Sequence, residues 1–329
     1  MIDKKGFFNA IYRFRIAILI FILLVIFTII SPGFISQNMI RALLLLLPAV
    51  GTVAIGETLV IITGNLDLSV GGIFALSGLV LVRTLPFGTA AALVLSVGSG
   101  LFVGLINGLI INKLKVNSLI ATIGMTFVLN GVVFLFAEGT IHFENDFLVG
   151  LGHSTLWIIP WSAILYLVLT AIVQFLLKST VFGIKLYAVG GNRISSSYSG
   201  IKVERTGIVA FVLSGFFAAL GGILLSSSLA AASPIYGSET AITVITAVLL
   251  GGTAISGGSG DVVKTLSGVL FIILLTKGLT QIEVSAYYQN MIIGALLIGL
   301  LFSSKKLHGT KRKKTSVKTL IKEGEENDI

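Results

Sequence analysis

The chain has 329 residues, of which 55% are hydrophobic and 11% are charged, and its mean hydropathy is +1.03. A water-soluble domain carries about 25% charged residues, so this composition excludes one. The absence of cysteine excludes disulfides and thiolate metal sites. The net charge of +9 is concentrated at the two ends and in internal loops beside hydrophobic runs, which is typical of a membrane topology signal. We therefore expect an integral membrane protein in the lipid bilayer, with no nucleic acid as partner and no metal or cofactor.

Apolar runs follow one another along the chain, and a helix crosses a bilayer in about 20 residues. The expected fold is an all-α, polytopic helical bundle. We expect ten membrane segments, at 16–34, 42–63, 66–83, 88–111, 116–137, 157–177, 207–228, 240–255, 262–282 and 287–303. The third and eighth segments are short and rich in glycine, which favours tilted, broken or re-entrant helices and leaves the count open by one or two.

Lysine and arginine predict the orientation. If both termini are cytoplasmic, twenty of the 23 basic residues lie on the inner side, as the positive-inside rule requires. The expected organisation is a cytoplasmic segment 1–15, a transmembrane permease domain 16–303 with a cytoplasmic loop 178–206, and a basic cytoplasmic tail 304–329. The polybasic stretch in that tail is interpreted as a topology signal and lipid-surface anchor.

Glycine spacing predicts how the helices pack. Gly100, Gly104 and Gly108 recur every four residues and give one flat helix face that a neighbouring backbone can approach closely. Gly215 and the pair 221–222 are expected to act likewise in the seventh segment. A short echo between ALSGLVLV (75–82) and TLSGVLFI (265–272) indicates a weak inverted repeat.

The stretch IITGNLDLSVGGIFALSG (61–78) places a carboxylate and a helix break inside an apolar run. Glycine at 64 can take the left-handed conformation that ends a helix, and asparagine at 65 or aspartate at 67 can cap the next one. A carboxylate in hydrocarbon costs about 2.5–3.5 kcal/mol on insertion scales, so it must cap, pair or face water. Two readings remain open, a structural turn and a polar lining of a substrate path. The residues concerned are Gly64, Asn65, Asp67, Ser69 and Gly71.

Four segments resemble the permease subunits of ribose/galactose/xylose-type ABC importers and occur in the order of that family. They are GETLVIITGNLDLSVGGIFALSG (56–78), FGIKLYAVGGN (182–192) followed by SGI (199–201), LSGFFAALGGILLSS (213–227) and LLGGTAISGGSGDV (249–262). The resemblance covers residues from about 40 to 303. It implies a bacterial inner-membrane permease for a monosaccharide, paired with a second permease copy or paralogue. It also implies a separate ABC ATPase and an extracytoplasmic sugar-binding protein.

The resemblance further implies that the loop 178–206 docks on the ATPase. The residues expected to form the docking element are Gly183, Gly190, Gly191, Asn192, Arg193 and Gly200. The family commonly has Glu-Ala-Ala within this loop, where this chain has Ile194, Ser195 and Ser196. The contact that a family glutamate could make is therefore missing, which leaves the choice of ATPase open.

Other functions are weighed against the same residues. The stretch GSGDVVKT (258–265) lacks the glycine that a P-loop needs directly before its lysine, so the chain is not expected to bind ATP or to be an enzyme. An ion-coupled secondary transporter would need buried carboxylates, for which only Glu57 and Asp67 qualify. A membrane enzyme would need a cluster of catalytic groups, and none is present in the sequence. Autoinducer-2 and nucleosides remain alternative cargoes.

Overall fold

Helices dominate the computed structural model, which describes residues 4–312. The helices are α1 (Lys4–Ile30), α2 (Gln37–Ile62), α3 (Val70–Thr84), η1 (Leu85–Phe87), α4 (Thr89–Asn112), α5 (Ser118–Phe136), α6 (Asp146–His153), α7 (Trp161–Ser179), α8 (Val181–Gly191), α9 (Arg193–Tyr198), α10 (Val203–Leu229), η2 (Pro234–Gly237), α11 (Thr240–Leu250), α12 (Val262–Gln281) and α13 (Ala286–Arg312). Four two-residue strands, β1 (Ile141–His142), β2 (Thr155–Leu156), β3 (Ile159–Pro160) and β4 (Ala231–Ala232), form two antiparallel pairs, β1 with β4 and β2 with β3.

The expected all-α membrane bundle is confirmed. Among the described residues, seven helices are long and apolar enough to cross a membrane, and the expected segments at 16–34, 240–255 and 287–303 coincide with shorter apolar helices. The segment 178–206, expected as a loop between membrane segments, contains the helices α8 and α9, and its cytoplasmic location stays a prediction. The expected tail 304–329 lies mostly outside the described residues, so its lipid-anchoring role stays a prediction.

The glycine stripe of α4 seats this helix against α10. A Cβ atom at Gly104 would lie 2.4 Å from the Phe211 carbonyl oxygen, and one at Gly100 would lie 2.3 Å from the Gly215 carbonyl oxygen. At Gly108 the nearest atom would be the Ile208 Cα, at 3.0 Å. The numbers of the contacting residues decrease along α10 as they increase along α4, so the two helices are antiparallel. The predicted close-packing face is therefore confirmed, and any side chain there would separate the helices.

Helix α10 is the centre of the bundle, because it also packs closely against α2 and α3. A Cβ atom at Gly221 would lie 2.6 Å from the Ala49 carbonyl oxygen of α2, and one at Gly222 would lie 2.1 Å from the Phe74 carbonyl oxygen of α3. Much of the buried core lies on these helices, and α2 is continuously buried from Gly51 to Ile62. The segments containing the break at 63–69 are therefore held in the most enclosed part of the molecule.

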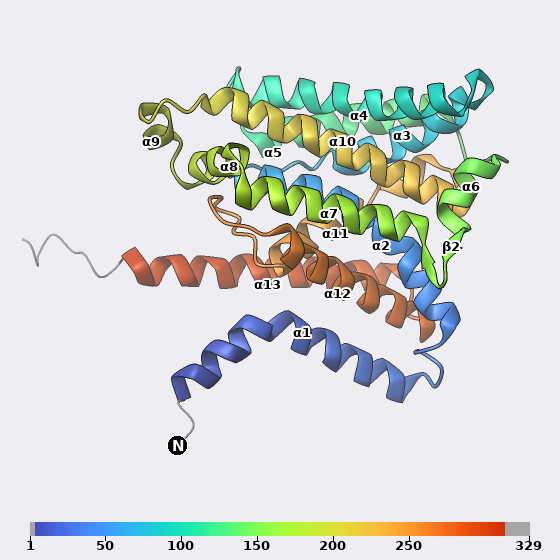
Figure 1. Cartoon of the computed structure of the whole chain (residues 1–329), viewed down its shortest axis with the longest axis horizontal. Helices are drawn as coiled ribbons and strands as arrows, with labels where there is room; N and C mark the ends of the chain where they lie inside the picture. Colours follow the sequence, from blue (N-terminus) through green and yellow to red (C-terminus); the bar gives the residue numbers. More distant parts are fainter. Residues whose placement is uncertain (1–3, 313–329) are drawn as a thin grey trace, which may run out of the picture.

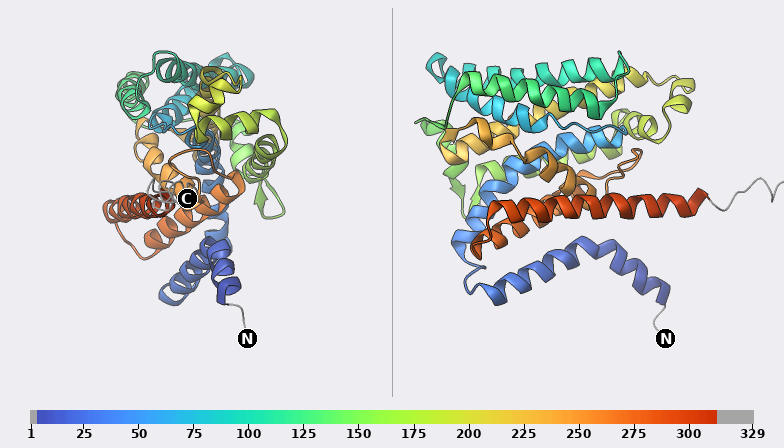
Figure 2. Two further views of the ribbon diagram at one scale, coloured as in Figure 1. Left: turned by 90° about the vertical axis from the view of Figure 1, so that its left-hand side faces the viewer. Right: turned by 180° about the vertical axis from the view of Figure 1, so that it is seen from behind.

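The two ends of the bundle differ in what they carry. The start of α1, the end of α13, the turn between α4 and α5, and the helices α8 and α9 lie at one end, which we call the α9 end (Figure 1). The strand pair β2–β3, helix α6 and the turn η1 lie at the opposite end, which we call the hairpin end (Figures 1 and 2). Both termini of the described chain are thus on the same side as the basic segments, as the charge distribution predicted.

Candidate functional site

The break between α2 and α3 is built around Asp67, whose side chain is fully buried. Helix α2 ends at Ile62, and Gly64 follows with a φ of +80°, the left-handed conformation that favours glycine. The Asp67 Oδ1 atom accepts hydrogen bonds from the Ser69 amide at 3.0 Å and the Ser69 hydroxyl at 2.6 Å. Its Oδ2 atom accepts from the Ser214 hydroxyl of α10 at 3.1 Å. The carboxylate therefore has donors on both oxygens and ties the break to the central helix.

The expectation that Asn65 or Asp67 caps the following helix was wrong in detail. Helix α3 begins two residues later than expected for a cap at Asp67, and Ser69 occupies the N-cap position without a side-chain cap bond. Asn65 instead donates from Nδ2 to the Thr63 hydroxyl at 3.0 Å. The reason is that Asp67 forms a turn with the backbone amide two residues on, which competes with helix capping.

Two further buried side chains join this network. The Asp67 amide donates to the Glu57 Oε1 atom at 3.1 Å, and the Asn107 Nδ2 atom donates to the Ser69 hydroxyl at 2.7 Å. Glu57 and Asn107 are both fully buried. The network thus joins α2, the break, α4 and α10 (Figure 1). Sequence reasoning missed Asn107 and treated Glu57 only as a possible ion site. The signal in the sequence that could have identified them is that the carboxylate of Glu57 and the amide of Asn107 each lie inside an apolar run.

Gly71 fixes the start of α3 against the turn that precedes α11. A Cβ atom at Gly71 would lie 2.3 Å from the Gly237 carbonyl oxygen, and one at Gly237 would lie 1.9 Å from the Gly71 carbonyl oxygen. The predicted tight packing directly after the break is therefore present. Its partner is the backbone of η2 at Gly237.

Three of the motif segments meet at the α9 end of α2. The Gly258 amide donates to the Ile62 carbonyl oxygen at 2.9 Å, so the loop 251–261 supplies a donor to the last turn of α2. Gly190 of α8 fills the same junction, because a Cβ atom there would lie 1.7 Å from the Ile62 carbonyl oxygen. The Tyr187 hydroxyl of α8 donates to the Gly260 carbonyl oxygen at 2.9 Å. We call this contact of α2, α8 and the loop 251–261 the backbone junction.

Asp261 closes the loop of the backbone junction. Its Oδ1 atom accepts from the Lys264 amide at 3.1 Å and caps α12, and its Oδ2 atom lies 3.1 Å from the Lys178 Nζ atom. Gln174 donates to the same Oδ2 atom at 3.1 Å. Partial burial raises the pKa of the Asp261 carboxyl, but the hydrogen bonds from Lys178, the Lys264 amide and Gln174 outweigh it, so this pKa lies below its ordinary value.

The residues predicted for docking fall into two groups. Gly183 and Gly190 pack against backbone, since a Cβ atom would lie 1.9 Å from the Leu177 carbonyl oxygen at Gly183 and 1.7 Å from the Ile62 carbonyl oxygen at Gly190. Gly191 and Gly200 have no neighbouring atom within 4 Å of a Cβ position, and Gly200 has a φ of +78°. Asn192 ends α8 and caps α9 by accepting from the Ser195 amide at 2.9 Å. Only the second group faces outward.

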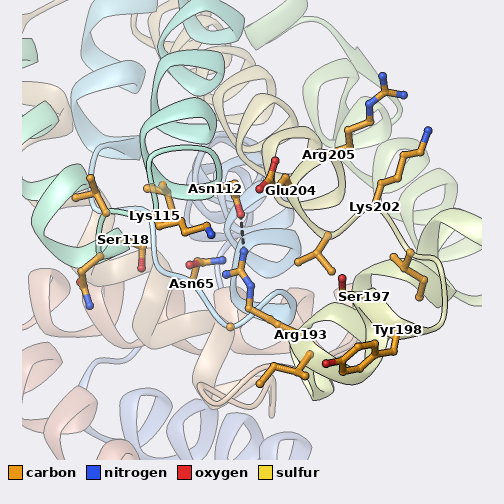
Figure 3. Close-up of a pocket in the computed structure, with 17 residues that line it drawn as sticks. Asn65, Asn112, Lys115, Ser118, Arg193, Ser197, Tyr198, Lys202, Glu204 and Arg205 are labelled. Carbon is orange, nitrogen blue, oxygen red and sulfur yellow. Dashed lines mark hydrogen bonds between the residues drawn. The ribbon is translucent and has the colours of Figure 1, made fainter.

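A cavity of about 970 Å³ opens at the α9 end between the break, the turn from α4 to α5, α9 and the start of α10. Figure 3 shows Asn65, Asn112, Lys115 and Arg193 gathered in its middle, with Lys202 and Arg205 extending toward the rim. The Arg193 Nη2 atom donates to the Asn112 Oδ1 atom at 3.0 Å. Its charged lining is therefore mainly basic, and Glu204 is the one acidic residue among the side chains that form it.

The cavity brings together two predicted groups that are far apart in the sequence. Gly64 and Asn65 of the break line it, and so does Arg193 of the predicted docking element. Asp67, Ser69 and Gly71 are buried beneath it and do not line it. The break therefore has a part at the cavity wall, the exposed Gly64 and the buried Asn65, and an enclosed part that holds the helices together.

Comparison with known proteins places the chain in a transport family. Residues 39–301 match the family model described as the branched-chain amino acid transport system permease component. The chain is 38% identical over 293 residues to the ribose import permease protein RbsC of Bacillus subtilis, which covers 87% of this chain and 91% of that one. It is 31% identical over 304 residues to the D-allose transport system permease protein AlsC of Escherichia coli, with coverage of 90% and 93%.

A third relative extends the range of named cargoes. The L-arabinose ABC transporter permease protein AraH of Azospirillum brasilense is 34% identical over 309 residues, covering 91% of this chain and 89% of that one. No solved structure matches the chain. The match of the family model, the relatives along nearly the full length and the apolar helical bundle agree with one another. The chain is a membrane protein and belongs to the ABC transporter permease family that contains the ribose import permeases.

Proposed function

We propose that this chain is the membrane-spanning subunit of an ABC importer for a monosaccharide of the ribose type. The observation that most strongly supports this proposal is the sequence identity of 31–38%, over nearly the whole chain, to permeases named for ribose, D-allose and L-arabinose. The family description mentions branched-chain amino acids, but these three relatives are sugar permeases. The energy comes from a separate ATPase, and an extracytoplasmic binding protein delivers the sugar.

In this proposal the α9 end faces the cytoplasm and α9 with the adjoining turn docks on the ATPase. The basic residues of the α9 end support the orientation under the positive-inside rule. The outward position of Gly191 and the exposed side chains of Ile194 and Tyr198, which are 70% and 90% exposed, support the docking surface. Ile194 replaces the glutamate common in the family, so the contact here is apolar at that position.

The sugar path lies between two permease copies. Two cavities lie at the ends of the described chain, one of about 970 Å³ at the α9 end and one of about 610 Å³ beside α6 and α7. Neither set of lining residues continues through the bundle, whose centre is filled by α2 and α10. We expect a second copy or a paralogue to supply the other wall of the path.

The break has a structural part and a path part in this scheme. Asp67, Ser69 and Gly71 hold α2, α3 and α10 in place through buried contacts. Gly64 and Asn65 line the cytoplasmic cavity and lie within reach of movements of α9. Discontinuous helices commonly frame transport routes in this way.

Uptake in reconstituted vesicles tests the function. The permease is inserted together with its ATPase and binding protein, and the entry of labelled ribose is compared with that of D-allose, L-arabinose and leucine. We expect uptake of one of the sugars that requires ATP and both partners, and none of leucine. Accumulation by the permease alone in an ion gradient would overturn the proposal in favour of a secondary transporter, and uptake of leucine only would overturn the sugar assignment.

A further inference from the structure

One long face of the chain is formed by α5, the segment η2–α11 and α13. Figure 2 shows these elements on the same side of the bundle, opposite α7, with α13 in front in the right-hand view. Contacts link α5 to η2 and α11 to α13. We call this side the α5–α13 face. It is a candidate wall of the path between two copies, so its polar side chains need an explanation.

Asn130 is the polar side chain on this face that bilayer physics leaves unexplained. It is exposed and makes no hydrogen bond with any described residue. It lies six residues before the end of α5, about 9 Å into the span at 1.5 Å per residue. Lipid tails offer no hydrogen-bond partner, and an unpaired amide in an apolar medium costs about 1–3 kcal/mol.

The exposed polar side chains of the other described spans differ from Asn130 in position or in hydrogen bonding. They lie near helix ends or, like Thr28, bond to the backbone of their own helix, here to the Leu24 carbonyl oxygen at 2.6 Å. An amide placed within the span without such a partner is expected to face water or a ligand. A path between two copies supplies both.

The neighbours of Asn130 suit a sugar ring. Phe127 and Phe134 lie three residues before and four residues after it, on the same flank of α5, and are 73% and 51% exposed. Leu129, one residue away, is buried beside Gly72 of α3 and fixes the rotation of the helix. Asn130 is thus flanked by two aromatic side chains and turned away from the α3 contact.

The same face carries a second polar group nearer the hairpin end. The Asn290 Nδ2 atom of α13 donates to the Glu239 Oε1 atom at the residue before α11. Tyr287, three residues earlier on α13 and therefore on the same flank as Asn290, is 82% exposed. Carboxylate and amide groups beside aromatic rings are donors, acceptors and apolar surfaces in the combination by which pockets hold small polar ligands.

We propose that the outer half of the α5–α13 face is a monosaccharide-binding stretch of the path, with Asn130 as its hydrogen-bonding residue in the membrane and Glu239–Asn290 as its outer station. The hydroxyl groups of the sugar bond to the amide and the carboxylate, and its C–H faces lie against the phenylalanine and tyrosine rings. This inference rests on the proposed monosaccharide function and adds the residues that touch the cargo.

The absence of cysteine in the chain makes a direct test possible. A single Asn130→Cys variant and a matched Val128→Cys variant are assembled with the ATPase and binding protein in vesicles. Both positions are exposed on α5, but two residues are about 200° apart around a helix. A water-soluble methanethiosulfonate reagent is expected to modify the cysteine at 130 at least tenfold faster than that at 128, and transported sugar is expected to slow the reaction.

A second variant separates sugar contact from structure. Asn130→Leu should reduce uptake at low sugar concentration by up to about tenfold, as loss of one hydrogen bond predicts, while thermal stability and ATPase association stay unchanged. Equal labelling at 130 and 128, or normal uptake by Asn130→Leu, would overturn the inference. Because the wild-type complex is measured in parallel, failure of its ATP-driven uptake would instead count against the proposed function.

Discussion

The break at Asp67 and the α9 end both contain glycine, serine and asparagine, yet the two regions differ in burial. Asp67 and Ser69 are fully buried, and their polar atoms bond to one another and to α4 and α10. Around α9, Gly191 is open and Tyr198 is 90% exposed. Burial, more than composition, therefore separates a turn that holds helices together from one that is available to a partner.

We expect the largest loss of stability from a substitution at Gly190. This residue belongs to the predicted docking segment, but it packs against the backbone of α2. In Gly190→Val the new side chain would meet the Ile62 carbonyl oxygen and the Gly258 amide, both backbone atoms. Overpacking typically costs about 1–3 kcal/mol, and backbone on two sides favours the upper end or more. Thermal unfolding in detergent should show a large loss of folded protein. A stable Gly190→Val variant would show that the backbone junction can open.

Asp67→Ala tests the break with the next largest effect. The substitution leaves two donors of Ser69 and the hydroxyl of Ser214 without their acceptor. A buried unsatisfied group costs about 1–3 kcal/mol, so we expect a total of about 3 kcal/mol. Asp67→Asn is the matched control, because its amide oxygen keeps one acceptor and its loss should be smaller. Equal stability of wild type and Asp67→Ala would show that this hydrogen-bond network does not stabilise the break.

Gly191→Trp tests the exposed side and should leave the fold intact. No atom lies within 4 Å of a Cβ position at Gly191, so unfolding temperature and yield should match wild type. If the α9 end binds the ATPase, a bulky group there should weaken co-purification about tenfold or more, since interface centres tolerate misfit poorly. Gly98→Trp, at another open glycine in the apolar part of α4, is the control. Identical ATPase binding by Gly191→Trp would exclude this residue from the contact.

We expect the smallest effect on stability at Asp261, which closes the loop 251–261 of the backbone junction. Its folded-state pKa is lowered, so the stability it contributes is present above the unfolded pKa of about 3.9 and is lost as the pH falls through the lower folded value. Lys178 is largely exposed, so the contribution should stay below about 1 kcal/mol. The difference in unfolding temperature between wild type and Asp261→Asn should shrink as the pH is lowered from 6 to 3. A difference that grows with acidification would contradict the assigned pairing.

Much of the helix arrangement could be predicted because apolar runs and glycine spacing are local signals. The membrane segments and the face formed by Gly100, Gly104 and Gly108 follow from length and periodicity, and the structure confirms them. The inverted repeat and the inward orientation of the termini stay predictions. The helical form of 181–198 was not foreseen, because the segment was interpreted as a loop; its glycines at 183 and 190 fit helices packed against backbone.

The candidate site was less predictable, because its partners are distant in the sequence. Asp67 could be identified as a carboxylate that needs a partner, but its bond with Ser214 and the bond of Asn107 with Ser69 could not be assigned before the fold was known. The same holds for Gly258 and Ile62, which bond across nearly two hundred residues. The exposed amide of Asn130 looked unremarkable in the sequence, since its meaning depends on which way α5 is turned.

The backbone junction also bears on how a distant subunit can act on the membrane interior. The carbonyl of Ile62, the amide of Gly258 and the chain at Gly190 touch without intervening side chains. Side chains can change rotamer and absorb a displacement, whereas peptide groups in contact have no such slack. If a partner binds at the α9 end, a displacement of α8 would therefore reach the end of α2, two residues from Gly64, through direct contact between backbone atoms.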